Sequence, residues 1–200
     1  TCPPTRSGGF GSSSEKRWMS GCAAAPQGIS ASNGMQTQNT VEEIRHRLSG
    51  IATLYHRLVL LVGPSRSGKT AALRALAKAD GLPLVNVGVE LSQRLLDLTE
   101  RQRALQAPRL LEDVAVSLPA DVLLLDNTEV LFASALRQDP LRLLQGVSRG
   151  RTIVAAWLGT VDGGYVTYAV PEHPEFRRYP SNDLMIVALG QGDRAEQVQR

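Results

Sequence analysis

The feature that most constrains this chain is an eight-residue loop between an apolar stretch and a helical stretch. Residues 63–70 read Gly-Pro-Ser-Arg-Ser-Gly-Lys-Thr and match the phosphate-binding loop pattern GxxxxGK[ST] at every fixed position. Five apolar residues, Leu58–Val62, precede the loop, and a stretch of helical character, Lys69–Ala79, follows it. A strand, a glycine loop and a helix in this order are the context that the motif requires. We therefore predict that the loop holds the phosphates of a nucleotide.

The residue types in this loop each suit a phosphate ligand. Gly63 and Gly68 let the backbone turn so that consecutive N–H groups point at a phosphate, and the next helix presents its positive end there. Lys69 reaches the β- and γ-phosphates, and the hydroxyl of Thr70 is a ligand for Mg²⁺. We expect ATP and Mg²⁺ as cofactors. The residues predicted to bind the nucleotide are Gly63, Pro64, Ser65, Arg66, Ser67, Gly68, Lys69, Thr70 and Ala71.

A magnesium site needs a carboxylate beside such a loop, and the chain offers Asp126. Four apolar residues, Val122–Leu125, precede it, so Asp126 ends a predicted buried strand. Because ligands gather at the carboxyl ends of parallel strands, we expect Asp126 and the loop at the same edge of the sheet. We predict Thr70 and Asp126 as metal ligands. The alternative is that Asp126 caps a helix that follows the strand.

The position after Asp126 departs from the pattern of many hydrolysing ATPases, which place a glutamate there. Asn127 can orient water, but an amide cannot accept its proton, which predicts slow hydrolysis. Glu129 is close enough in sequence to substitute, or else it is a solvated helix residue. Many ATPases of the AAA+ type also carry a polar sensor residue after the fourth strand, where this chain has Ala156 and Trp157. The predicted catalytic residues are Lys69, Asp126, Asn127 and Glu129.

Strands and helices alternate along the chain, which predicts an α/β domain. We expect the fold of a P-loop NTPase, a three-layer sandwich with a mainly parallel five-stranded sheet, plus a small β-hairpin over residues 161–168. A helix from Thr40 to Leu54 would begin with a capping box at Thr40. The other predicted helices cover residues 69–79, 91–98, 107–118 and a segment through 141–144. The predicted strands are Leu58–Val62, Leu84–Val89, Val122–Leu125, Thr152–Trp157 and Leu184–Leu189.

Composition divides the chain into three parts. Residues 1–34 are rich in Gly, Ser and Pro and predict a disordered tail, either an over-extended start before Met35 or a non-native extension. The NTPase domain is expected over residues 35–190, and residues 191–200 form a polar C-terminal tail. Both cysteines, Cys2 and Cys22, fall in the first part, which leaves no disulfide framework for the domain.

Charge and hydropathy exclude some classes of function. Of the net charge of +3, residues 1–34 account for +2, so the domain is nearly balanced and we expect any contact with DNA to be indirect. No apolar run is long enough to cross a membrane and no signal peptide is evident, which favours the cytoplasm. The three histidines, His46, His56 and His173, do not have the spacing of metal ligands.

Four arginines are candidates for an arginine finger that acts across subunits. They precede the fourth and fifth predicted strands. A solvated surface role is the favoured alternative for each, because the chain has many arginines. The four are Arg149, Arg151, Arg177 and Arg178.

Three further segments carry a family resemblance. Residues 124–132 (LLDNTEVLF), 139–149 (DPLRLLQGVSR) and 151–157 (RTIVAAW), followed by the TYA, HPE and RRY tripeptides between 167 and 179, resemble the small P-loop protein of type 3 BREX phage-defence systems. The likeness covers roughly residues 40–190. It implies a cytoplasmic, bacterial nucleotide-binding component of a multi-gene system that modifies host DNA and blocks phage replication.

We therefore expect an ATP-binding, slow Mg²⁺-dependent ATPase that works with other proteins of a defence assembly. After Leu189 too few residues remain for the helical lid of a full AAA+ protein, so the site is expected to be completed by a second copy or by a partner. One alternative is a nucleotide-sensing module that does not hydrolyse ATP. Another is a small-molecule kinase on the same fold.

Overall fold

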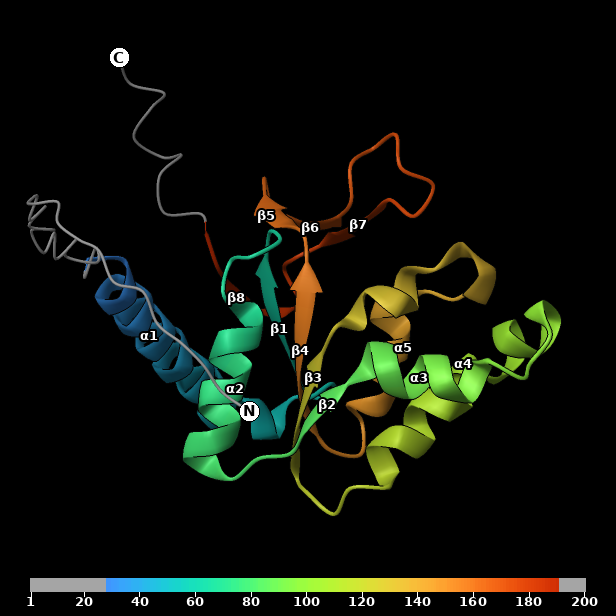
Figure 1. Cartoon of the computed structure of the whole chain (residues 1–200), viewed down its shortest axis with the longest axis horizontal. Helices are drawn as coiled ribbons and strands as arrows, with labels where there is room; N and C mark the ends of the chain where they lie inside the picture. The colour runs from blue at the N-terminus through green and yellow to red at the C-terminus, as the bar shows by residue number, and fades with distance from the viewer. Residues whose placement is uncertain (1–27, 191–200) are drawn as a thin grey trace, which may run out of the picture.

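Five parallel strands form a single sheet at the centre of the molecule (Figure 1). The computed structural model describes residues 28–190. The strands lie in the order β2-β3-β4-β1-β8, and every neighbouring pair is parallel. This confirms the predicted five-stranded sheet. Its strands are β1 (Leu58–Gly63), β2 (Leu84–Asn86), β3 (Val122–Asp126), β4 (Thr152–Leu158) and β8 (Met185–Ala188).

Helices cover both faces of this sheet and make the predicted three layers (Figure 1). On one face lie α1 (Gly28–Gly50) and α2 (Lys69–Asp80). On the other face lie α3 (Val87–Leu95), α4 (Glu100–Val116) and α5 (Pro140–Val147). Short 3-10 segments lie in two of the connections. Ile51–Thr53 lies between α1 and β1, and Thr128–Phe132 and Ser134–Leu136 lie between β3 and α5.

The continuous apolar run of β1 explains why both faces are covered. All six residues of β1 are buried. Successive side chains of a strand point to opposite faces, so Val59 and Leu61 pack with α1 and α2, and Leu60 packs with α3 to α5. A strand that is apolar on both faces has to lie between two helical layers.

A second sheet of three antiparallel strands sits beyond the carboxyl edge of the first. It consists of β5 (Thr160–Asp162), β6 (Tyr165–Tyr168) and β7 (Arg177–Pro180), in that order. Strands β5 and β6 are the predicted hairpin. Strand β7 was not predicted, because the sequence Arg-Arg-Tyr-Pro lacks an alternating apolar pattern and is a strand only through its pairing with β6.

Aromatic contacts join the two sheets. The rings of Tyr168 and Phe132 stack with centroids 3.5 Å apart, and the indole N–H of Trp157 donates to the carbonyl of Thr167 at 3.0 Å. Trp157 is fully buried at the end of β4. Trp157 and Tyr168 are therefore packing residues.

Several boundaries expected from the sequence were wrong. The helix expected to start at residue 107 starts at Glu100, after a capping box at Thr99. Helix α1 begins at Gly28, so Thr40 lies inside it and donates to the carbonyl of Gln36 at 2.9 Å instead of capping a helix start. Residues 28–34, expected in the tail, are thus helical. Strand β2 ends at Asn86, whose side chain accepts from the N–H of Val89 and starts α3, so Val87–Val89 are helical and not extended.

Residues 1–27 and 191–200 lie outside the described part of the chain, and with them Cys2, Cys22 and most of the two predicted tails. Within residues 28–190, no helix has the length and apolar character needed to cross a membrane.

We predict that replacing Gly159 by alanine destabilises the junction between the sheets. A Cβ at this position would lie 1.8 Å from the carbonyl oxygen of Thr167, so β6 or the end of β4 has to move. We expect the free energy of unfolding in urea to fall by about 3 kcal/mol, the upper range for overpacking. Gly50→Ala is the matched control, because a Cβ there meets nothing within 4 Å. Equal stability of the two variants would contradict the prediction.

Candidate nucleotide-binding site

The loop after β1 turns tightly at the carboxyl edge of the sheet, and its glycines are required by geometry. A Cβ on Gly63 would lie 2.5 Å from Oγ of Ser67 and 3.0 Å from Leu189. Gly68 has a φ of +92°, in the left-handed region that favours glycine, and α2 begins at the next residue. Gly63 therefore stands where the loop has no room for a side chain, and Gly68 stands where the backbone needs a positive φ.

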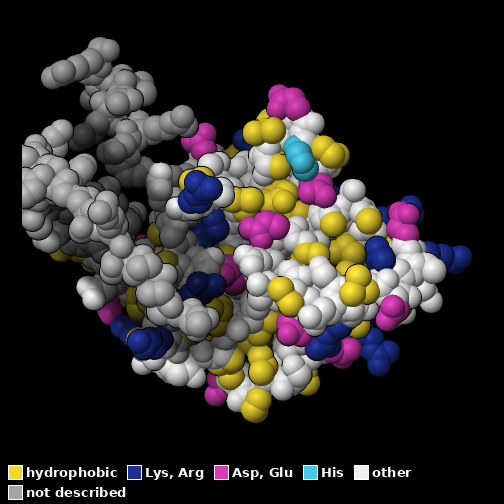
Figure 2. Space-filling view, in the orientation of Figure 1, with side chains coloured by type: hydrophobic (Ala, Val, Ile, Leu, Met, Phe, Trp, Pro, Cys, Tyr) yellow, Lys and Arg dark blue, Asp and Glu magenta, His cyan; other side chains and the backbone are white. Residues whose placement is uncertain are grey.

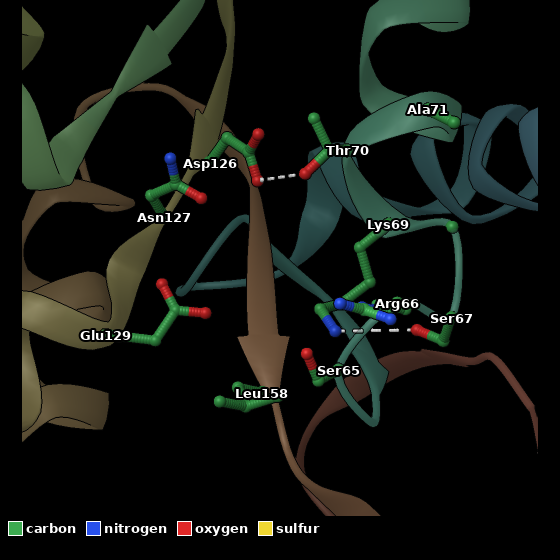
Figure 3. Close-up of a pocket in the computed structure, with 11 residues that line it drawn as sticks. Ser65, Arg66, Ser67, Lys69, Thr70, Ala71, Asp126, Asn127, Glu129 and Leu158 are labelled. Carbon is green, nitrogen blue, oxygen red and sulfur yellow. Dashed lines mark hydrogen bonds between the residues drawn. The ribbon is translucent and has the colours of Figure 1, made fainter.

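Lys69 folds back over the loop. Its Nζ donates to the carbonyl oxygens of Gly63 and Pro64, both at 2.7 Å. It also donates to Oγ of Ser67 at 3.4 Å, the bond drawn in Figure 3. Only 8% of the residue is exposed. Burial lowers the pKa of the Lys69 ammonium, and the nearby carboxylates of Glu129 and Asp126 partly oppose that shift. The buried ammonium of Lys69 thus lies on the loop side of the site, and the carboxylates of Asp126 and Glu129 lie across from it.

Asp126 ends β3 and faces the start of α2. Only 6% of the Asp126 residue is exposed. The hydroxyl of Thr70 donates to Oδ1 of Asp126 at 3.1 Å (Figure 3). This contact confirms that the loop and Asp126 emerge on the same edge of the sheet. It also argues against the alternative helix-capping role, since the residue that precedes the next helical turn is Asn127.

A cavity of about 320 Å³ lies between the loop and the end of β3. Ten of the predicted binding and catalytic positions line it, and Leu158 at the end of β4 joins them. Gly63 and Pro64 do not line it: the carbonyls of both hold Lys69 instead. The lining residues are Ser65, Arg66, Ser67, Gly68, Lys69, Thr70, Ala71, Asp126, Asn127, Glu129 and Leu158.

The residues of this cavity fit a magnesium-bound triphosphate. The backbone of the Gly68–Thr70 segment opens a helix and presents N–H groups, which bind phosphate oxygens. The hydroxyl of Thr70 and the carboxylate of Asp126 are oxygen donors of the type that Mg²⁺ prefers, and they already lie side by side. Lys69 supplies a positive charge within the loop itself.

Asn127 adopts a left-handed backbone conformation, with φ 53° and ψ 52°. Asparagine tolerates this conformation better than most residues. The turn lets the 3-10 segment Thr128–Phe132 run back toward the loop, and Figure 3 shows the Glu129 carboxylate pointing into the cavity. Glu129 is therefore not on a solvated helix face, which was the alternative that its sequence position left open.

Thr128 supports this turn and was missed by the sequence analysis. Its side chain is 1% exposed, and its hydroxyl donates to the carbonyl of Ala156 in β4. The contact links the end of β3 to the end of β4 just where the cavity opens. The only signal in the sequence is a threonine at the start of a helical segment, which ordinarily indicates a cap.

The arginine-finger candidates lie elsewhere. Arg149 and Arg151 stand in the turn before β4, at the amino edge of the sheet, and Arg177 and Arg178 lie in β7. None of the four lines the cavity. Among residues 28–190, no group of three His, Cys, Asp or Glu side chains is placed to hold a metal ion, so a magnesium site here depends on Thr70 as well as Asp126.

No protein-family model matches the chain, and no curated protein matches it in sequence. Solved structures of similar fold include the following two. AMPPCP-bound DnaA from Aquifex aeolicus is 17% identical over 62% of this chain and 38% of that one, with a TM-score of 0.36. PCH-2 of C. elegans is 16% identical over 82% of this chain and 44% of that one, with a TM-score of 0.41. This chain therefore spans less than half the length of either structure. The P-loop NTPase fold stands on its own strand order, loop and carboxylate.

We predict that Thr128→Val lowers the stability of the protein by about 1–2 kcal/mol. Valine keeps the shape of threonine but leaves the buried carbonyl of Ala156 without its hydroxyl donor. Urea unfolding measures the change, and Thr53→Val, at an exposed position, is the control. A loss no greater than that of the control would show that the hydroxyl does not hold the turn.

Proposed function

We propose that the protein binds ATP with Mg²⁺ in the cavity at the loop and hydrolyses it slowly. The observation that carries this proposal is the contact between Thr70 and Asp126, 3.1 Å between oxygens that lie 56 residues apart in sequence. It places a hydroxyl from the start of α2 and a carboxylate from the end of β3 on one side of the loop. Both groups serve as metal ligands only if they meet at this point.

Each residue of the cavity has a role in this proposal. The backbone N–H groups of the loop bind phosphate oxygens, and Lys69 turns from its carbonyl partners toward the β- and γ-phosphates. Thr70 and Asp126 would hold Mg²⁺, directly or through its water shell, and the ion would neutralise charge on the phosphates. Asn127, at the mouth of the cavity, orients a water molecule through its amide.

Glu129 is the group proposed to accept the proton in hydrolysis. The water oxygen bonds to the γ-phosphorus, the bond from that phosphorus to the bridging oxygen breaks, and the water proton passes to the Glu129 carboxylate. Burial lowers the pKa of the Lys69 ammonium, and the Glu129 carboxylate lies near enough to oppose that shift in part. Because it stands two residues beyond the usual glutamate position, we propose slow turnover.

Phosphate release tests the binding and catalytic roles together. We expect Lys69→Ala and Asp126→Ala to lower steady-state phosphate release by at least about 100-fold, since Lys69 supplies a positive charge to the transferring group and Asp126 would hold the Mg²⁺ that does the same. Arg74→Ala, on the exposed face of α2, is the control and should leave the rate unchanged. ATP binding by calorimetry with no release above the Lys69→Ala rate would instead establish the nucleotide-sensing alternative.

Glu129→Gln separates binding from chemistry. The amide keeps the size of the side chain but cannot accept a proton, so we expect ATP affinity to hold and phosphate release to fall about 100-fold. Glu112→Gln on α4 makes the same change away from the cavity and should have no effect. Unchanged release by the Glu129→Gln variant would remove Glu129 from the mechanism.

A second cavity favours one other function, transfer of the phosphoryl group to a small acceptor. It measures about 410 Å³ and shares Ser65 and Leu158 with the first. None of its lining residues is Lys or Arg, and burial together with the carboxylates of Glu175 and Glu129 raises the pKa of the Tyr168 phenol at its wall. Such surroundings suit a neutral or cationic molecule with a hydroxyl group. Thin-layer separation of labelled products distinguishes free phosphate from a phosphorylated acceptor.

We also propose, on the sequence resemblance described above, that the protein acts in the cytoplasm as a component of a bacterial BREX anti-phage assembly. Its partners would be other proteins of that system, or further copies of this chain that complete the site. Adding the purified products of neighbouring genes to the phosphate-release assay tests the role, because a partner that completes the site should raise the rate.

A further inference from the structure

A second group of basic side chains lies at the amino edge of the sheet, at the opposite end from the phosphate-binding loop. Arg142 of α5, together with Arg149 and Arg151, lines a groove of about 380 Å³ between α4 and α5. Strand β4 starts at Thr152, directly after Arg151, so the groove lies at the amino end of this strand. The phosphate-binding loop instead follows the carboxyl end of the neighbouring parallel strand β1. The groove is thus separate from the nucleotide cavity.

Two of these arginines are not neutralised by an ion pair within the part of the chain that the structure describes. Arg142 and Arg149 are exposed, and within residues 28–190 neither forms an ion pair. Arg151 is held differently, since its guanidinium donates to the carbonyls of Ala115 and Leu118 and neutralises the negative end of α4. Glu112 is the acidic residue that lines the groove, so three arginines face one carboxylate.

The floor of the groove is open to a ligand. Gly146 and Gly150 line it, and a Cβ built on either would meet no atom within 4 Å.

Over most of the face shown in Figure 2, basic and acidic side chains are interspersed. The near-zero net charge of the domain therefore describes the average surface and not this groove.

An exposed aromatic ring stands beside the arginines. Tyr55 is 73% exposed, and the guanidinium of Arg149 lies 5.5 Å from the centre of its ring. The edge of the neighbouring His56 ring packs on Tyr55, and Nδ1 of His56 lies 3.1 Å from the carbonyl oxygen of Gln145 in α5. These contacts fix an aromatic ring next to the groove and expose it to solvent.

We propose that this groove binds single-stranded nucleic acid, with Arg142 and Arg149 on the phosphates and a base on Tyr55. Guanidinium groups match the geometry of phosphate oxygens, and an exposed aromatic ring stacks on a base of any sequence. An acidic protein segment would use the arginines but has no need of the exposed ring. This proposal replaces the expectation of indirect DNA contact, which rested on net charge alone.

Fluorescence anisotropy of a labelled 20-nucleotide single strand tests the proposal, without nucleotide or Mg²⁺, so that its outcome is independent of the ATPase. We expect binding to weaken roughly sevenfold between 50 and 200 mM salt, as the two phosphate contacts of Arg142 and Arg149 imply. Arg142→Glu with Arg149→Glu should weaken binding at least about tenfold. Tyr55→Ala should weaken binding to the single strand more than binding to the duplex of the same sequence.

Arg74→Glu with Lys78→Glu, on the exposed face of α2, is the matched control because it makes the same change in charge on the other side of the sheet. Circular dichroism checks that each variant is folded. The proposal is overturned if the folded protein does not bind the strand, if both double variants lose affinity equally, or if neither does. Competition by poly-glutamate as strong as that by unlabelled strand would also overturn it, in favour of an acidic protein partner.

Discussion

The parallel pairing of β3, β4 and β1 is the constraint on which the rest of the structure depends. Because the three strands run in the same direction, the loop after β1 and the carboxylate after β3 leave the sheet at one edge. Strand β4 separates them by one strand width, and the first turn of α2 closes that gap, so that Thr70 contacts Asp126. Burial of β1 on both faces stabilises this arrangement, since any shift of the strand would expose an apolar side chain.

The small antiparallel sheet β5-β6-β7 also lies at the carboxyl edge, where it contacts the phosphate-binding loop. The N–H of Gly159 donates to the carbonyl of Gly63 at 3.1 Å, and that carbonyl also accepts from Lys69. Gly159 in turn packs directly against the backbone of β6. The small antiparallel sheet is thus fixed to the loop through backbone atoms, and the second cavity between them takes its walls from both.

Local patterns predicted the elements whose signals are contained in their own residues. The apolar runs of β1 and β3 and the glycine loop fall within a residue or two of their expected places. One element was missed because a contact from elsewhere decides it: β7 exists only through its pairing with β6. Two other predictions failed because a local signal was misinterpreted. Asn86 ends β2 by capping α3. Thr40, which looks like a cap, is internal because α1 continues upstream of it.

The sequence by itself determined the loop, its lysine and threonine, the strand that ends in Asp126, and the absence of a glutamate after it. These depend on residue type and on spacing within one short segment. Only the tertiary structure decided that Glu129 points into the cavity, because that follows from the left-handed turn at Asn127 and from the bond between Thr128 and β4. The gathering of Arg142, Arg149 and Tyr55 at one groove was likewise decided by tertiary structure. Tyr55 lies far from the two arginines in the chain, and the net charge of the domain does not record where charged side chains meet.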